Sequence, residues 1–140
     1  MSFSDSHSPA WEPILAAAWQ AWARAYAPYS GFRVGAALLR ADGTIVPGCN
    51  VENAAYPVCQ CAERTALCAA VSQGMAAGGM LAMAVVTEGG TLSPPCGACR
   101  QVLAEFAEDL PILLANRAER SLCRLHELLP QAFTGRHLAR

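Results

Sequence analysis

The sequence predicts a layered α/β domain in which helices cover a mixed sheet of about five strands. Segments with apolar residues at helical spacing alternate with short apolar runs bounded by turn residues, a pattern typical of helices packed on a sheet. The dipeptide Asp42-Gly43 lies between the first two apolar runs and is a strong hairpin signal. Because a hairpin pairs its strands antiparallel, we expect the sheet to be mixed and not purely parallel.

The first expected helix covers residues 13–27, and Pro28 ends it because proline cannot continue a helix. Its apolar side chains recur at helical spacing. They are Ile14, Leu15, Ala18, Trp19, Trp22 and Tyr26. The polar residues 1–12 are expected to form a flexible arm before this helix, and the hairpin strands are expected over residues 34–39 and 44–49.

The rest of the chain alternates further helices with further strands. A helix that stops at Gly74 is expected first, since glycine commonly ends helices. The expected helices are residues 62–73, residues 96–107 and a last helical turn at residues 127–129. The expected strands are residues 81–87, residues 112–115 and a short strand at residues 122–124.

Length and composition limit the kinds of protein this chain can be. The 140 residues fit one domain, in which residues 134–140 form a tail. The formal net charge is -1 and the ten basic residues, all arginine, are scattered, whereas nucleic-acid-binding proteins usually show a basic face. No secretion signal is visible at the start, and the longest apolar run, residues 75–86, is too short to span a bilayer. With seven cysteines, these features predict a cytoplasmic protein with reduced thiols and neither a nucleic-acid nor a membrane partner.

Three cysteines have the spacing of a zinc site that leaves one coordination position open. Cys96 and Cys99 are three residues apart, so their sulfurs face one side of a helical first turn, and Cys61 supplies a third thiolate. Residues two apart on a helix point to nearly opposite sides, so Cys61 and Glu63 can share a site only if Cys61 precedes the regular turns. Helix N-termini also stabilise thiolates. The sequence therefore predicts two helix N-termini directed at one metal ion.

Two questions stay open on spacing alone. Cys59 could be a fourth ligand that closes a structural zinc site in a non-catalytic protein, although Glu63 would then have no purpose. Asn50 and Glu52 project to one side of an extended chain, where they could bind a pair of sugar hydroxyls or belong to an Asx-rich turn.

Five segments in order resemble the cytidine deaminase family, in its small homotetrameric form. They are Ala27-Pro28-Tyr29-Ser30, Val34-Gly35-Ala36-Ala37-Leu38-Leu39, Gly48-Cys49-Asn50-Val51-Glu52-Asn53-Ala54, Cys61-Ala62-Glu63-Arg64-Thr65-Ala66 and Pro95-Cys96-Gly97-Ala98-Cys99-Arg100-Gln101-Val102. The resemblance covers about residues 28–133. It implies a three-layer α-β-α sandwich, one Zn²⁺ per subunit, and a homotetramer with sites near the subunit interfaces.

The resemblance also implies the reaction. Free cytidine, and 2'-deoxycytidine, would be hydrolysed to uridine or deoxyuridine plus ammonia, in pyrimidine salvage. Cys61, Cys96 and Cys99 would hold the zinc, and Glu63 would carry protons between water, N3 of the base and the departing amine. Arg64 would hydrogen-bond the zinc thiolates. An alternative substrate is a related aminopyrimidine nucleoside, such as a blasticidin-type antibiotic.

By the same resemblance, five further residues would bind the substrate. Phe32 would stack on the pyrimidine ring, and Ala62 would line the site. Asn50 and Glu52 would bind the ribose hydroxyls, which favours the first reading of that pair. Phe133 would cover the site of a neighbouring subunit.

Overall fold

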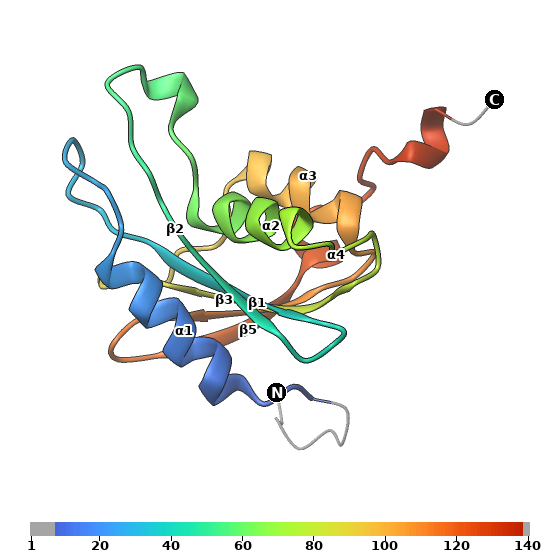
Figure 1. Ribbon diagram of the computed structural model, residues 1–140, viewed down its shortest axis with the longest axis horizontal. Coiled ribbons are helices and arrows are strands. Elements are labelled where there is room, and N and C mark those ends of the chain that lie inside the picture. Colours follow the sequence, from blue (N-terminus) through green and yellow to red (C-terminus); the bar gives the residue numbers. More distant parts are fainter. Residues whose placement is uncertain (1–7, 139–140) are drawn as a thin grey trace.

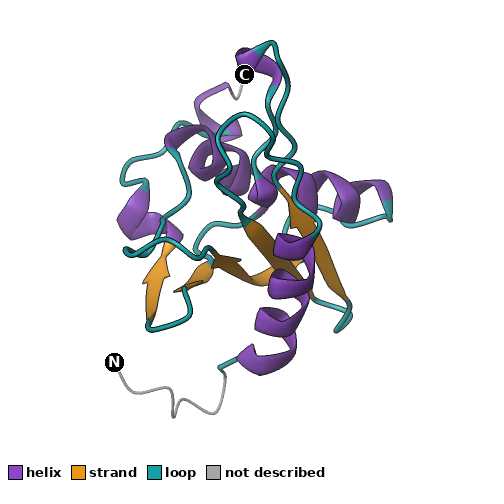
Figure 2. Cartoon of the chain, turned by 90° about the vertical axis from the view of Figure 1, so that its left-hand side faces the viewer, coloured by secondary structure: helices purple, strands orange, loops and turns teal. Residues whose placement is uncertain are grey.

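The structure, a computed structural model, describes residues 8–138 as three layers (Figures 1 and 2). The middle layer is a sheet in the order β2-β1-β3-β4-β5. Its strands are β1 (Gly35–Arg40), β2 (Ile45–Cys49), β3 (Met80–Val86), β4 (Pro111–Ala115) and β5 (Arg120–Arg124). One face is covered by α1 (Trp11–Ala23), and the other by α2 (Ala62–Ser72), α3 (Gly97–Phe106) and α4 (Leu125–Leu128). The expected three-layer α-β-α sandwich is confirmed.

The sheet is mixed, as the hairpin predicted. β1 pairs antiparallel with β2 and β3, β4 pairs antiparallel with β5, and β3 and β4 are parallel. The hairpin turn contains Gly43 at a φ of 88°, in the left-handed region that glycine adopts without a steric penalty. Asp42 Oδ1 accepts a hydrogen bond of 2.9 Å from the backbone N–H of Thr44 and completes the turn.

The buried side chains form one cluster on each side of the sheet. The larger cluster joins the sheet to α2, α3 and α4, and the smaller one joins it to α1. β3 contributes to both, because Met83 and Val85 face the larger cluster while Ala82 and Ala84 face the smaller one. This double burial is typical of a central strand that carries parallel pairing.

Two glycines allow helices to contact the hairpin strands directly. A Cβ on Gly35 would lie 2.0 Å from Ala18 O in α1, and a Cβ on Gly48 would lie 2.3 Å from Ala66 N in α2. Neither position has room for a side chain. Gly48 therefore brings the first turns of α2 against β2.

The first helix begins earlier than the sequence suggested. α1 starts at Trp11, which is buried, so Trp11 and Glu12 belong to the helix and not to the expected arm of residues 1–12. Residues 8–10 of that expected arm have no regular secondary structure, and residues 1–7 lie outside the described residues.

The predicted end of the first helix is wrong. α1 ends at Ala23, well before Pro28, and Tyr26 pairs with Val51 instead. Tyr26 N donates a 3.0 Å hydrogen bond to Asn50 O, and Tyr26 O accepts one of 2.9 Å from the backbone of Glu52. This pairing replaces the helical hydrogen bonds of the last predicted turn. The other expected helices and strands are present, and each has bounds within two residues of those expected.

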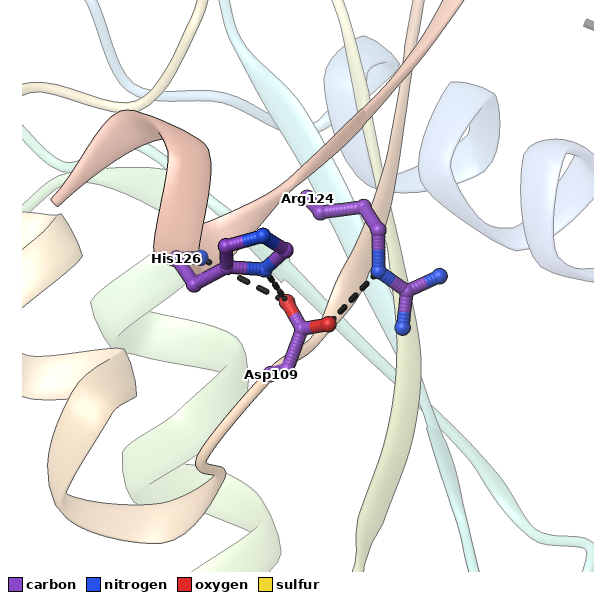
Figure 3. A network of polar contacts seen from close by, with 3 residues as sticks. All are labelled: Asp109, Arg124 and His126. Atoms are coloured by element: carbon purple, nitrogen blue, oxygen red, sulfur yellow. Dashed lines mark hydrogen bonds and ion pairs between the residues drawn. The ribbon is translucent and has the colours of Figure 1, made fainter. Parts of the chain in front are cut away.

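A polar network fixes the start of the C-terminal segment (Figure 3). Asp109 Oδ2 accepts a 2.7 Å hydrogen bond from Arg124 Nε, and its Oδ1 lies 2.6 Å from His126 Nδ1. Partial burial of Asp109 opposes ionisation, but the hydrogen bonds from His126 and Arg124 hold the pKa of this carboxyl below its ordinary value. The network ties the end of β5 and the start of α4 to the loop before β4.

Both edge strands carry residues that discourage further pairing. Pro47 is exposed in the middle of β2 and has no N–H to donate. At the other edge, β5 begins and ends with Arg120 and Arg124, which form ion pairs of 2.7 Å with Glu12 and Asp109. Across residues 8–138, no helix combines the length and the apolar content that a membrane crossing requires.

Candidate active site

Two helix N-termini meet at the predicted metal site. Cys61 is the N-cap residue of α2, with φ -76° and ψ 153°, and Cys96 is the N-cap residue of α3, with φ -66° and ψ 167°. Because Cys61 is extended and precedes the regular turns, its side chain can lie on the same side as that of Glu63. The predicted placement of Cys61 at the helix start is confirmed.

The three predicted sulfurs lie close together. The Sγ atoms of Cys61, Cys96 and Cys99 are all within 4.8 Å of one another, and those of Cys61 and Cys96 are 4.0 Å apart. Zinc–thiolate bonds are about 2.3 Å long, so a small contraction of the cluster would let these three sulfurs hold a zinc ion. Within residues 8–138, no other group of three or more His, Cys, Asp or Glu side chains is arranged to hold a metal.

The electrostatics of this cluster favour a cation among the sulfurs. The hydrogen bond from the Cys99 thiol, with the charge of Arg64, lowers the pKa of Cys61 to about 5. The pKa of Cys99 is raised, because its thiol donates to Cys61 and is buried. Arg64 Nη2 donates a hydrogen bond of 3.3 Å to Cys61 Sγ. The Cys61 thiolate is thus favoured here, and a divalent cation among the sulfurs would also favour ionisation of Cys99.

Glu63 is buried beside the sulfurs, in the first turn of α2. Its residue is 5% exposed, and burial together with the neighbouring Cys61 charge raises the pKa of its carboxyl above the ordinary value. A carboxyl with a raised pKa takes up a proton more readily than an exposed one, as a group that both accepts and releases protons requires.

Cys59 is engaged elsewhere. Its Sγ accepts a 3.2 Å hydrogen bond from the N–H of Asn53 and donates one of 3.6 Å to Asn53 O, and it does not belong to the sulfur cluster. The alternative of a closed four-cysteine site is therefore not supported. The arrangement of the cysteines fits a three-sulfur site with one open coordination position better than a closed four-sulfur site.

A cavity of about 280 Å³ adjoins the sulfur cluster, close to the lower end of the range typical of small-molecule sites. Its wall brings together seven of the residues predicted from the sequence. They are Phe32, Asn50, Glu52, Cys61, Ala62, Glu63 and Cys96. Cys99 is fully buried behind them.

Several wall residues were not predicted. Val34 and Val85 contribute apolar surface to the wall, and Gln60, Ser93 and Pro94 also line it. The signal for three of them was available, since Gln60 directly precedes Cys61 and Ser93-Pro94 leads into Pro95-Cys96. The two valines lie next to or at the ends of strands that the sequence showed only as buried runs.

Phe133 does not line this cavity. It is 57% exposed, its carbonyl accepts a 2.9 Å hydrogen bond from Gln101 Nε2, and its ring stacks on His137 with centroids 5.2 Å apart. Its role over a neighbouring subunit stays a prediction. A larger groove of about 870 Å³ lies between α3, α4 and this C-terminal segment, but no cysteine borders it, so size alone does not identify the site.

Asn50 and Glu52 make hydrogen bonds within the chain. Asn50 Oδ1 accepts from Val34 N at 2.8 Å, and Asn50 Nδ2 donates to Phe32 O at 2.8 Å. Glu52 Oε1 accepts from the N–H groups of Tyr29 and Ser30 at 3.0 and 3.1 Å. The pKa of Glu52 is lowered by its hydrogen bonds from Ser30. Both side chains face the cavity and also fix the loop of residues 29–34.

The sequence matches a known family over most of its length. Residues 11–113 match the family model described as the cytidine and deoxycytidylate deaminase zinc-binding region. The cytidine deaminase of Sporosarcina psychrophila is 47% identical over 130 residues, which are 91% of this chain and 94% of that protein. The cytidine deaminase of Mycobacterium tuberculosis H37Rv is 47% identical over 123 residues, or 88% and 89% of the two chains.

Solved structures agree with these sequence matches. The crystal structure of cytidine deaminase from Burkholderia pseudomallei superposes with a TM-score of 0.84 at 47% identity, covering 86% of this chain and 97% of that one. The crystal structure of cytidine deaminase from M. tuberculosis gives a TM-score of 0.76 at 44% identity, covering 89% and 98%.

Proposed function

This chain belongs to the cytidine and deoxycytidylate deaminase family with its zinc-binding region, and we propose that it hydrolyses free cytidine to uridine and ammonia. We extend the proposal to 2'-deoxycytidine and to a place in pyrimidine salvage. The observation that carries it is the juxtaposition of the three sulfurs and buried Glu63 on the wall of one cavity.

The enzyme is a zinc-dependent hydrolase, and Cys61, Cys96 and Cys99 are the residues that would hold the ion. When bound, zinc acts as a Lewis acid that makes water available as a nucleophile near neutral pH. Arg64 donates to Cys61 Sγ and offsets part of the negative charge of the sulfurs, as do the two helix N-termini.

Glu63 moves the protons of the reaction. It accepts a proton from the attacking water and delivers it to N3 of the pyrimidine, which makes C4 electrophilic. After water oxygen adds to C4, Glu63 passes the second proton of that water to the amino group, and the C4–N bond breaks to release ammonia. Burial raises the pKa of Glu63 above its ordinary value, which makes the protonated carboxyl easier to reach, so one group can serve as base and then as acid.

The remaining cavity residues are proposed to hold the nucleoside. Phe32 offers an aromatic face to the pyrimidine ring, and Ala62 borders the base beside Glu63. Asn50 and Glu52 meet the ribose hydroxyls. A carboxylate has about four acceptor positions, so Glu52 can keep its loop contacts and still accept from a sugar hydroxyl.

The proposed assembly is a homotetramer with sites near subunit interfaces. Large apolar side chains are exposed on the loop after α1 and between the end of β2 and the end of the η1 turn (Tyr56–Val58). They are Tyr26, Tyr29, Val51, Tyr56 and Val58. Phe133 is exposed on a segment that extends away from the sheet, where it can reach another copy (Figure 1). Light scattering coupled to size-exclusion chromatography should give four times the mass of one chain, and a monomer would contradict the assembly.

A cytoplasmic location is also proposed. All seven cysteines are free thiols, a state that the reducing cytoplasm maintains. Fractionation of cells that express the full chain should recover the deaminase activity with cytoplasmic marker enzymes.

A direct assay tests the activity. Zinc-loaded protein is mixed with cytidine, and uridine and ammonia are followed together; both should appear in equal amounts. The same assay with Glu63→Gln should show almost no product. A panel containing 2'-deoxycytidine, free cytosine and a blasticidin-type nucleoside should show turnover of the first and little of the others. Faster turnover of the antibiotic than of cytidine would reassign the substrate.

A further inference from the structure

We propose that Ser30 is a positioning residue of the nucleoside pocket, whose hydroxyl links the carboxylate of Glu52 to the backbone of Phe32. The inference rests on the proposed function, because it assumes that this cavity takes the nucleoside. It adds a residue outside the cavity wall that sets the position of two groups on that wall.

Ser30 contacts both groups at once. Its Oγ donates its single proton to Glu52 Oε2 and accepts a 3.0 Å hydrogen bond from the N–H of Phe32. Its own N–H donates to Glu52 Oε1 at 3.1 Å, beside the 3.0 Å bond from Tyr29 N. Both carboxylate oxygens are therefore held, and the orientation of Glu52 depends on the turn that contains Ser30.

The backbone of Phe32 has no regular secondary structure to support it. Its N–H is bonded to Ser30 Oγ, and its carbonyl accepts from Asn50 Nδ2 at 2.8 Å. Phe32 is 46% exposed as a residue, so packing alone does not fix its ring. The neighbouring Gly31, at a φ of 69°, turns the chain between Ser30 and Phe32. The direction of the ring therefore depends on these two side-chain hydrogen bonds.

Loss of the Ser30 hydroxyl would release both groups together. Glu52 would lose the donor to Oε2 and could rotate about its terminal torsion, and the N–H of Phe32 would lose its acceptor. The sulfurs and Glu63 would keep their geometry, because the starts of α2 and α3 hold them. The effect should therefore appear in nucleoside binding and not in the chemical step.

Kinetics of Ser30→Ala test this separation. Hydrogen bonds to charged groups have the strength to change affinity by about tenfold or more, so KM for cytidine should rise at least that much while kcat stays within about twofold. The dissociation constant of the product uridine should rise by a similar factor. Ser30→Thr keeps the hydroxyl and should restore both constants.

Ser72→Ala is the matched control. Ser72 Oγ also donates a side-chain hydrogen bond, 2.8 Å to Ala69 O at the end of α2, but it has no contact with the cavity wall. This variant should leave KM, kcat and uridine affinity unchanged.

Amide hydrogen exchange gives a readout that needs no turnover. In Ser30→Ala the amide of Phe32 should exchange faster, whereas that of Val34 should stay protected because its acceptor is Asn50 Oδ1. An unchanged Phe32 amide, an unchanged KM, a fall confined to kcat, or failure of Ser30→Thr to restore binding would each overturn the proposal. If the wild type did not convert cytidine, the proposed function would fail, and the exchange and uridine measurements would still decide the role of Ser30.

Discussion

The two halves of the cavity are built in different ways. In the metal half, Cys61, Glu63 and Cys96 stand at the starts of α2 and α3, and the regular backbone of these helices sets their positions. In the sugar half, Phe32 and Glu52 lie on irregular segments that are fixed by side-chain to backbone hydrogen bonds. The metal half is thus rigid through secondary structure, and the sugar half only through a few polar contacts.

This difference assigns the chemical step and the affinity to separate parts of the chain. Changes at the helix starts should act on metal content and kcat, and changes in the loop of residues 29–34 should act on KM. The following experiments test that division, from the largest expected effect to the smallest.

Cys96→Ala should abolish activity altogether. Cys96 is an exposed sulfur at the start of α3, so its loss should leave the fold intact while the zinc content falls well below one ion per chain. Metal analysis and the cytidine assay check this, with Cys68→Ala, an exposed cysteine on α2, as the control that should keep both. Full zinc content in Cys96→Ala would contradict the assigned ligand set.

Glu63→Gln should lower kcat by at least about 10²–10⁴-fold, the usual contribution of a general acid–base group. Zinc content should stay at the wild-type level because the ligands are untouched. Steady-state kinetics with metal analysis measure both, and a variant that kept a tenth of the wild-type kcat would remove Glu63 from the proton-transfer role.

Phe32→Ala should raise KM for cytidine by about 5- to 150-fold, since stacking of an aromatic side chain on a base is worth about 1–3 kcal/mol. The rate at saturating cytidine should change little, because Phe32 lies on the loop of residues 29–34 and its loss leaves the helix starts that hold the sulfurs and Glu63 in place. A large fall in kcat at unchanged KM would break the proposed division of the site.

Gly48→Ala should destabilise the protein by about 1–3 kcal/mol, the usual cost of adding a methyl group to a packed interior. Its Cβ would meet Ala66 N at 2.3 Å and Ala62 O at 2.6 Å, so α2 would have to move. Because Cys61 is the N-cap residue of α2, this movement should lower the affinity for zinc. Urea unfolding and zinc affinity measure this. Gly90→Ala, where a Cβ would meet nothing within 4 Å, is the control and should change neither.

The pH dependence of stability should change in Glu63→Gln when zinc is removed with a chelator. The pKa of Glu63 is raised in the folded state by burial, so its contribution is fully present below the ordinary value of 4.5 and is lost as the pH rises toward the folded value. Glutamine does not ionise. As the pH rises above 4.5, the wild type should therefore lose unfolding free energy that Glu63→Gln does not lose, and the stability difference should shift in favour of the variant. Urea unfolding across this pH range measures the shift. A constant difference between the two proteins would show that the pKa is not raised.

The metal half could be predicted from the sequence because its geometry depends on residues that are two or three positions apart in the chain. The spacing of Cys96 and Cys99 on one helical turn, and the two-residue step from Cys61 to Glu63, directly constrain the geometry. The alternation of helical and apolar segments likewise predicted the layers, and the Asp42-Gly43 hairpin signal predicted the mixed sheet. These patterns repeat every few residues, and hydrophobic periodicity gives information only about residues that are close in the sequence.

The sugar half could be predicted only in part, because its contacts join residues far apart in the chain. The hydrogen bonds of Asn50 and Glu52 to the loop of residues 29–34 span 16 to 23 residues. Spacing alone left that pair undecided between a sugar site and a turn. The same long-range pairing ends α1 at Ala23, since Tyr26 pairs with Val51 instead of continuing the helix.

The edges of the sheet limit how copies of this chain can associate. A strand approaching β2 from outside would find no amide hydrogen at Pro47, and one approaching β5 would meet a charged arginine at each end, Arg120 and Arg124. The sheet is thus protected against open-ended growth into fibrils. Contact between copies is left to helices and loops, where a symmetric arrangement can close on itself and stop at a finite number of chains.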